Sequence, residues 1–224
     1  MKIRWHLLTV LIFTQISWAK GSPDLLPAKA TDLHPTQASV GMESVRIKAE
    51  LFRKMNHSTR KNFLQKHPVP VIVGPDQKFH LIDHHHMGRA LIEAGHRNLF
   101  VTIVHDWSQK SKSEFWSDME TNGYTYLRDT ADNKITPDEL PETLNLLQDD
   151  PYRSLAYFAR EDGAFNKVAV PFEEFFWASF YRKNIQPGEL SHWKTAIKKA
   201  VRLSKSPEAC HLPGFKGPKP CAQE

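Results

Sequence analysis

The spacing of hydrophobic residues changes along this chain and separates a strand-containing first half from a helical second half. Short apolar runs bounded by turn residues predict strands at 33–37, 69–73, 79–82 and 99–104. In the same half, apolar residues at helical spacing and helix-forming composition predict helices at 42–55, 59–66, 87–94 and 114–119.

A loop lies between the two halves. Residues 129–142 include Pro137 and Pro141, which are typical of irregular structure. Helical composition dominates after this loop and predicts helices at 142–148, 153–160, 172–181 and 190–203. Strands before the loop and helices after it predict an α+β fold with a mainly helical C-terminal half.

The first residues have the pattern of a secretory signal peptide. Lys2 and Arg4 precede an apolar stretch from Leu7 to Ile16, and the small residue Ala19 follows. The stretch is shorter than the roughly 20 residues of a membrane span. We therefore expect a secreted or periplasmic protein, cleaved after residue 19, without stable membrane insertion. An uncleaved anchor or a buried N-terminal helix is the alternative.

The remaining chain divides into three predicted parts. Residues 20–32 form a Pro-containing linker, residues 33–204 a single domain, and residues 205–224 a Pro/Lys-rich tail. The tail holds both cysteines, Cys210 and Cys221, and an even count in an exported chain predicts one disulfide. Two free thiols are the alternative.

Charge and short motifs narrow the function only partly. The formal net charge of +5, minus the two charges lost with residues 1–19, leaves +3, which fits a polyanionic partner without requiring one. The sequence contains no GxxxxGK[ST], HExxH or GxSxG motif. These absences argue against P-loop nucleotide hydrolysis, zinc proteolysis and α/β-hydrolase chemistry.

The densest group of reactive side chains is Asp83-His84-His85-His86, between a predicted strand and a predicted helix. Free N–H groups and the dipole at a helix start favour anions. Imidazoles can add hydrogen-bond donors or transfer protons, and a carboxylate can orient one of them. Structural packing of one or two histidines is the alternative. The sequence assigns no metal ligands, although a divalent metal is open as a cofactor.

A second polar group follows at residues 149–182. Asp150-Pro151 is typical of a helix start, and it is followed by Tyr152 and Arg153, candidates for contact with a phosphate. Glu174 and Arg182 flank an aromatic run that is typical of a core. Glu174 is predicted either as the buried partner of Arg153 or a histidine, or as a general base.

Together these segments resemble the ParB-like nuclease family of the ParB/sulfiredoxin superfamily. The resembling segments are HPTQASVG at 34–41, VIVGPDQKFHLIDHHHMGRAL at 71–91, FW at 115–116, DDPYRSLAYFAR at 149–160, PFEEFFWASFYR at 171–182 and LPGF at 212–215. The resemblance spans roughly residues 32–215. It implies a small mixed sheet with helices, followed by a mainly helical half, with a phosphate held at a helix start.

The resemblance also implies roles for particular residues. The related motif Asp-Gly-His-His-Arg has glycine where this chain has His84, and its closing arginine is displaced here to Arg89. The implied catalytic residues are Asp83, His84, His85 and His86. The implied substrate- and phosphate-binding residues are Arg89, Tyr152, Arg153 and Glu174.

The expected function is therefore that of an exported phosphodiesterase or nuclease, a hydrolase acting on nucleic acid or another phosphoester. Export favours hydrolysis because water is the second substrate. The alternatives are a nucleotide-dependent phosphotransferase, similar to free-serine kinases, and a phospho-ligand-binding module without turnover. No specific protein partner is predicted.

Overall fold

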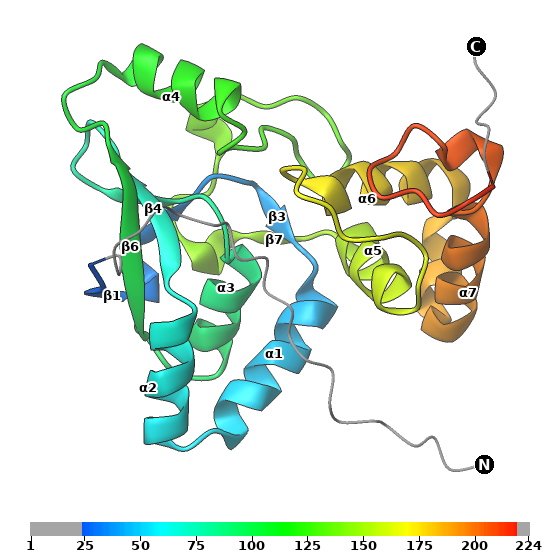
Figure 1. The fold of residues 1–224 in the computed structure, drawn as a ribbon, viewed down its shortest axis with the longest axis horizontal. Coiled ribbons are helices and arrows are strands. Elements are labelled where there is room, and N and C mark those ends of the chain that lie inside the picture. The colour runs from blue at the N-terminus through cyan, green and yellow to red at the C-terminus, as the bar shows by residue number, and fades with distance from the viewer. Residues whose placement is uncertain (1–23, 219–224) are drawn as a thin grey trace.

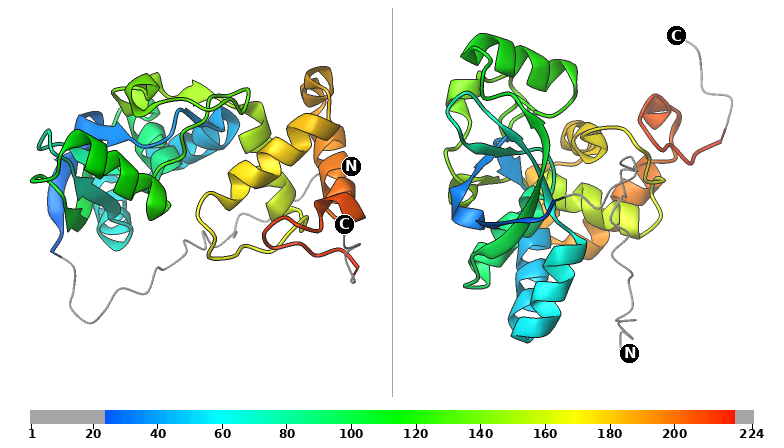
Figure 2. Two further views of the ribbon diagram at one scale, coloured as in Figure 1. Left: turned by 90° about the horizontal axis from the view of Figure 1, so that it is seen from above. Right: turned by 60° about the vertical axis from the view of Figure 1, so that its left-hand side comes forward.

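The computed structural model describes residues 24–218, which form a sheet lobe and a helical lobe side by side (Figures 1 and 2). The sheet lobe holds the first ten helices and strands and the helical lobe the last three helices, with the short strand β7 between them. In chain order the elements are β1 Leu26–Lys29, β2 Leu33–Pro35, β3 Ser39–Val40, α1 Met42–Lys54, α2 His57–Lys66, β4 Val69–Val73, β5 Phe79–Leu81, α3 His85–Glu93, β6 Asn98–Asp106, α4 Lys112–Thr121, β7 Gln148–Asp149, α5 Pro151–Glu161, α6 Glu173–Asn184 and α7 Trp193–Leu203.

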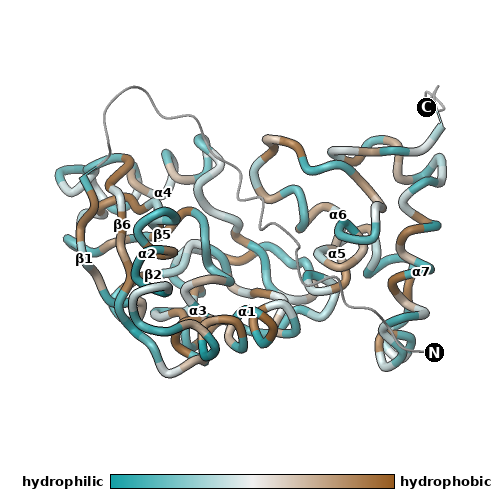
Figure 3. The backbone as a smooth tube through the Cα atoms, turned by 60° about the horizontal axis from the view of Figure 1, so that its bottom comes forward, coloured by the Kyte–Doolittle hydropathy of each residue, from teal (hydrophilic) through white to brown (hydrophobic). Residues whose placement is uncertain are grey.

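Five strands of the sheet lobe form one mixed sheet in the order β1-β6-β4-β5-β2. The β4–β6 and β2–β5 pairs are parallel, whereas β1–β6 and β4–β5 are antiparallel. Every residue of β4 is buried, as expected for a short apolar run in the middle of a sheet. Helices α1 and α3 pack against each other and share the main core with β4. Figure 3 shows hydrophobic and hydrophilic residues alternating along α1, as a half-buried helix requires.

The helical lobe has its own core around α5, α6 and α7. Trp177 is fully buried there, stacks on Phe165 at 4.3 Å between ring centroids, and donates its indole N–H to the Pro213 carbonyl at 2.8 Å. Ala209 and Leu212 belong to the same core. The first part of the predicted tail is therefore packed against the helices.

Helix starts join the two lobes. Strands β3 and β7 pair in parallel directly before α1 and α5, so the two helices begin next to each other. Asp149 accepts from the Met42 amide at 2.9 Å, and the Ser154 hydroxyl accepts from the Glu43 amide at 3.2 Å. A Cβ atom on Gly41 would lie 2.5 Å from the Ser154 nitrogen. Only glycine permits this approach of α5 to the start of α1.

The predicted α+β fold is confirmed, and two local predictions are wrong. The predicted linker 20–32 contains β1, which pairs with β6 from Leu26 to Lys29 as an edge strand. The predicted helix 142–148 is a 3-10 turn at Leu144–Leu146 followed by β7. Both strands depend on partners distant in the sequence, so local patterns did not reveal them.

Two predictions concern residues outside the described range. The signal peptide at 1–19 and Cys221 both lie there, so the cleavage and the Cys210–Cys221 disulfide stay predictions. Among residues 24–218, no helix has the length and apolar character needed to cross a bilayer.

Candidate functional site

His84 occupies the turn between β5 and α3 in a left-handed conformation. It is the N-cap of α3, with φ 67° and ψ 21°, a region that favours glycine. Asp83 fixes the turn by accepting from the His84 amide at 2.6 Å. The chain therefore has a histidine in a conformation that favours glycine, the residue that the related motif has at this position. The Asp83 carboxylate also lies 3.8 Å from Nδ1 of His84.

Burial lowers the pKa of His84, and His67 and Lys167 lower it further, although Asp83 opposes the shift. The imidazole is thus neutral near pH 7. Its side chain keeps 15% of its surface exposed, so the group lies at the edge of the fold.

His85 is engaged in a structural hydrogen bond. Its Nε2 accepts from the backbone amide of Thr36 at 3.1 Å, and the Thr36 hydroxyl donates to the Leu81 carbonyl at 2.8 Å. An acceptor nitrogen requires a neutral ring with its proton on Nδ1. Burial lowers the pKa of His85 to about 3. With this geometry His85 holds the segment before α1 in place, and it is poorly suited to transfer a proton.

His86 makes the equivalent bond to the start of α1. Its Nε2 accepts from the Gly41 amide at 3.0 Å. Burial lowers its pKa well below the ordinary value, and the charges of Arg153, Lys48 and Arg160 lower it further. The first turn of α3 therefore holds Thr36 and Gly41 through two adjacent imidazoles.

Cations from α1 and α5 surround this helix start. Burial lowers the pKa of Lys48 to about 8, and its Nζ lies 4.4 Å from the centroid of the Tyr157 ring. Arg153 is 5% exposed, and its guanidinium lies 3.9 Å from the centroid of Phe175. Its Nε is buried and has no hydrogen-bond partner in the described part of the chain. The sequence had not pointed to Lys48.

Glu174 on α6 is the carboxylate at the centre of these cations. It accepts from Arg153 at 3.1 Å and from Arg160. Burial would raise its pKa, but Arg153 and Arg160 reverse the effect and hold it below the ordinary value. Glu174 is therefore ionised and has the buried-partner geometry that the sequence offered as one alternative. Arg160 was missed, although it lies seven residues after Arg153 and so shares its helix face.

The neighbouring Glu173 supports the loop before α6. Its Oε2 accepts from the Val168 amide at 2.8 Å, and its buried Oε1 has no hydrogen-bond partner among the described residues but lies 3.9 Å from Nη1 of Arg160. Burial raises its pKa, with a further rise from Glu174. Lys167 on this loop thereby stays next to the charged cluster.

Two predicted binding residues are engaged elsewhere. Tyr152 donates its hydroxyl to the Ile185 carbonyl at 2.7 Å. Arg89 uses all three nitrogens away from the start of α3, donating from Nε and Nη2 to Glu93 at 3.1 and 2.6 Å and from Nη1 to the Leu144 carbonyl at 3.1 Å. The structure therefore brings together His84, His85, His86, Arg153 and Glu174, and gives Tyr152 and Arg89 structural contacts.

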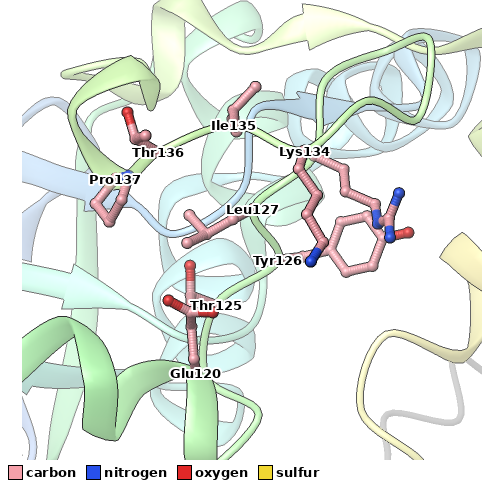
Figure 4. Close-up of a pocket in the computed structure, with 9 residues that line it drawn as sticks. Glu120, Thr125, Tyr126, Leu127, Lys134, Ile135, Thr136 and Pro137 are labelled. Atoms are coloured by element: carbon pink, nitrogen blue, oxygen red, sulfur yellow. The ribbon is translucent and has the colours of Figure 1, made fainter.

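An open pocket of about 390 Å³ is lined by residues between Glu120 and Pro137 (Figure 4). Thr125 and Tyr126 form part of its lining and both donate to the Thr36 carbonyl, at 2.8 and 2.9 Å. None of the predicted site residues lines it. Its one arginine, Arg128, is bonded to the Asp132 carbonyl. The charged cluster at α3 is therefore the better candidate for chemistry.

Residues 24–218 contain no cluster of side chains that could bind a metal ion. No three His, Cys, Asp or Glu side chains there are arranged to hold an ion. We accordingly derive no step through a metal.

The comparisons with known proteins agree with this architecture. A family model described as "Putative ParB-like nuclease" matches residues 26–183. The crystal structure of protein Atu1540 from Agrobacterium tumefaciens is similar, with a TM-score of 0.82 and 37% sequence identity, covering 88% of this chain and 98% of that chain. No curated protein matches the chain. From the family match over most of its length, the chain belongs to the ParB-like nuclease family.

Proposed function

We propose that this protein is a phosphodiesterase, of nuclease type, whose substrate phosphate binds at the start of α3. The observation that carries the proposal is the excess of positive charge there. Lys48, Arg153, Arg160 and Lys167 all act on the pKa of the ionised Glu174, and Glu161 and Glu173 lie 3.1 and 3.9 Å from Arg160, so four cations face three carboxylates. Buried positive charge without a counterion is unfavourable, so an anion is the natural ligand.

The helix itself adds to this attraction. The first turn of α3 carries backbone N–H groups without intrahelical acceptors and the positive end of the helix dipole. The His84 side chain does not cap these groups. A phosphate near this turn would meet N–H donors on one side and the cationic side chains of α1 and α5 on the other.

In the proposed reaction, water attacks phosphorus and the P–O bond to the leaving alcohol breaks. His84 takes the proton from water as general base, and Asp83 orients its ring. We assign this role to His84 because its side chain lies at the edge of the fold, 15% exposed, with Nδ1 3.8 Å from the Asp83 carboxylate. Lys48 and Arg153 stabilise the charge that develops on the phosphoryl oxygens. The leaving alkoxide takes up a proton from solvent and His84 releases its proton to solvent, so the products are a phosphomonoester and an alcohol.

Export is part of the proposal and rests on the sequence pattern of residues 1–19. A hydrolase needs only water besides its substrate, which suits a protein outside the cytoplasm.

A phospho-ligand-binding module without turnover is the second candidate. The observation that favours it is the structural engagement of His85 and His86, whose Nε2 atoms accept backbone hydrogen bonds and are not placed to take a proton from water. The two candidates bind the same anion and differ only in whether the phosphoester is cleaved.

The test is hydrolysis by the purified protein of bis(4-nitrophenyl) phosphate, DNA and RNA, each with magnesium, manganese or chelator. His84→Gly is the informative variant because glycine keeps the left-handed turn while the imidazole is removed. His211→Gln, at an exposed position outside the candidate site, is the control. We expect turnover by the wild type and by H211Q, and a loss of about 100-fold or more in H84G.

Other results would change the assignment. Equal turnover in H84G and wild type would refute His84 as the base. No turnover of any substrate would favour the binding module, and inorganic phosphate would then raise the melting temperature of the wild type.

A further inference from the structure

We infer that residues 53–67, the end of α1 together with α2 and its C-cap, form a basic surface that binds the phosphate backbone of a nucleic-acid polymer and leads it to His84. The inference rests on the proposed function and makes its substrate class more specific. A polymer long enough to contact this surface, rather than a small phosphodiester, would be the preferred substrate.

The first observation is the charge of this basic surface. Residues 53–67 contain five arginines and lysines and no aspartate or glutamate, and they are Arg53, Lys54, Arg60, Lys61 and Lys66. Helices of soluble proteins commonly balance lysine with glutamate one turn away, which adds stability. Helix α2 has no such acid and begins instead with the Asn56 side chain as its cap.

The second observation is that carboxylates do not neutralise these cations. The two arginines donate to backbone carbonyls, Arg53 to Glu93 at 2.6 Å and Arg60 to Met55 at 3.0 Å. Lys54, Lys61 and Lys66 are exposed, and within residues 24–218 they form no ion pair. The five charges thus remain available to an external polyanion.

The third observation is where the surface leads. Its last residue, His67, is close enough to His84 to act on the pKa of that imidazole, after the larger effect of burial. Its first residue, Arg53, contacts Glu93 at the opposite end of α3. Helix α1, which carries Arg53 and Lys54, packs on α3, and α2 packs on β6. The basic surface therefore starts at the proposed phosphate site and extends along the molecule from there.

The length of the surface suits a polymer. Glu93 follows His85 by eight positions in α3, which corresponds to about 12 Å along the helix axis. A DNA strand in a duplex carries one phosphate per about 3.4 Å, so roughly three or four phosphates span this distance. A small phosphodiester bound at His84 would leave Arg53 and Lys54 without a phosphate.

The chain also provides a matched control surface. Lys194, Lys198 and Arg202 are exposed on one face of α7, spaced four residues apart. Helix α7 packs against α5 in the helical lobe, at the other end of the molecule from α2 (Figure 1). Neutralising either set removes three positive charges, so the total charge of the two variants is equal.

The experiment compares K54Q/K61Q/K66Q with K194Q/K198Q/R202Q in the full protein. Fluorescence anisotropy measures binding of a labelled single-stranded oligonucleotide between about 50 and 200 mM salt. For the α1–α2 variant we expect at least tenfold weaker binding, and a salt slope reduced by about 2, because each neutralised contact removes about 0.7. We expect the α7 variant to bind like the wild type.

Turnover of bis(4-nitrophenyl) phosphate separates this inference from the proposed function. Equal binding losses in the two variants, or unchanged binding in K54Q/K61Q/K66Q, would overturn the basic surface even if the small substrate is hydrolysed. A binding loss confined to K54Q/K61Q/K66Q would support the surface, and absence of hydrolysis by the wild type would then refute only the catalytic proposal.

Discussion

The backbone amide of Gly41 donates to Nε2 of His86 at 3.0 Å, so the N-cap of α1 is bonded to the first turn of α3. Gly41 also lies against Ser154 at the start of α5, where no larger residue fits. Three helix starts are thereby fixed relative to one another. This arrangement holds Lys48 and Arg153, from different helices, beside the same imidazole.

Replacing His86 by alanine should destabilise the fold by about 1–3 kcal/mol, because the Gly41 amide loses its acceptor in a part-buried position. Urea unfolding followed by tryptophan fluorescence measures this change. His57→Ala, on the exposed start of α2, is the control and should lie within about 0.5 kcal/mol of the wild type. An H86A variant as stable as wild type but without activity would instead assign His86 to catalysis.

Stability should fall as the pH drops below the ordinary histidine value. Burial lowers the pKa of His85 from 6.5 to about 3 in the folded protein, so between these values the unfolded chain binds the extra proton. The stabilisation is complete above pH 6.5 and is lost progressively toward pH 3, by up to about 1.4 kcal/mol per pH unit for this group.

The window between about pH 5 and pH 6.5 isolates histidine effects from most carboxylates. Urea unfolding across this window, compared between wild type and His85→Asn, measures the contribution of His85. We expect a shallower pH slope in H85N. The same slope in both proteins would show that other groups cause the pH dependence.

The left-handed turn at His84 allows the stabilities of a glycine and an alanine variant at this position to be predicted. A side chain in this conformation costs about 1–2 kcal/mol, which glycine avoids. His84→Gly should therefore be more stable than His84→Ala by about 1 kcal/mol or more, and thermal melts of both variants measure the difference. If H84A were the more stable variant, the turn would not retain φ 67° in solution.

Local signals were enough to predict much of the fold. The apolar run at Val69–Val73 is β4, and Asp150-Pro151 begins α5 with the Asp150 carboxylate bonded to the Tyr152 amide at 3.0 Å. The roles within the candidate site could not be predicted in the same way. His85 and His86 bond to amides 49 and 45 residues away, and Lys48 approaches Glu174 only because α1 packs on α5.

The last prediction concerns the carboxylate among the cations. Glu174→Gln keeps the size of the side chain but removes its charge, so Arg153 loses its ionic partner and Arg160 keeps only Glu161 and Glu173. Breaking a buried ion pair in this way typically costs about 3–5 kcal/mol. The exposed pair Lys199–Glu189, at 2.8 Å, provides the control, and Glu189→Gln should cost about 1 kcal/mol or less.

Inorganic phosphate distinguishes this prediction from simple destabilisation. With Glu174 neutral, the same cations attract an anion more strongly, so phosphate should raise the melting temperature of E174Q more than that of wild type. Differential scanning fluorimetry with phosphate and with chloride at equal ionic strength measures the effect. If phosphate stabilised E174Q no more than chloride does, the cations around Glu174 would be a structural network and not a phosphate site.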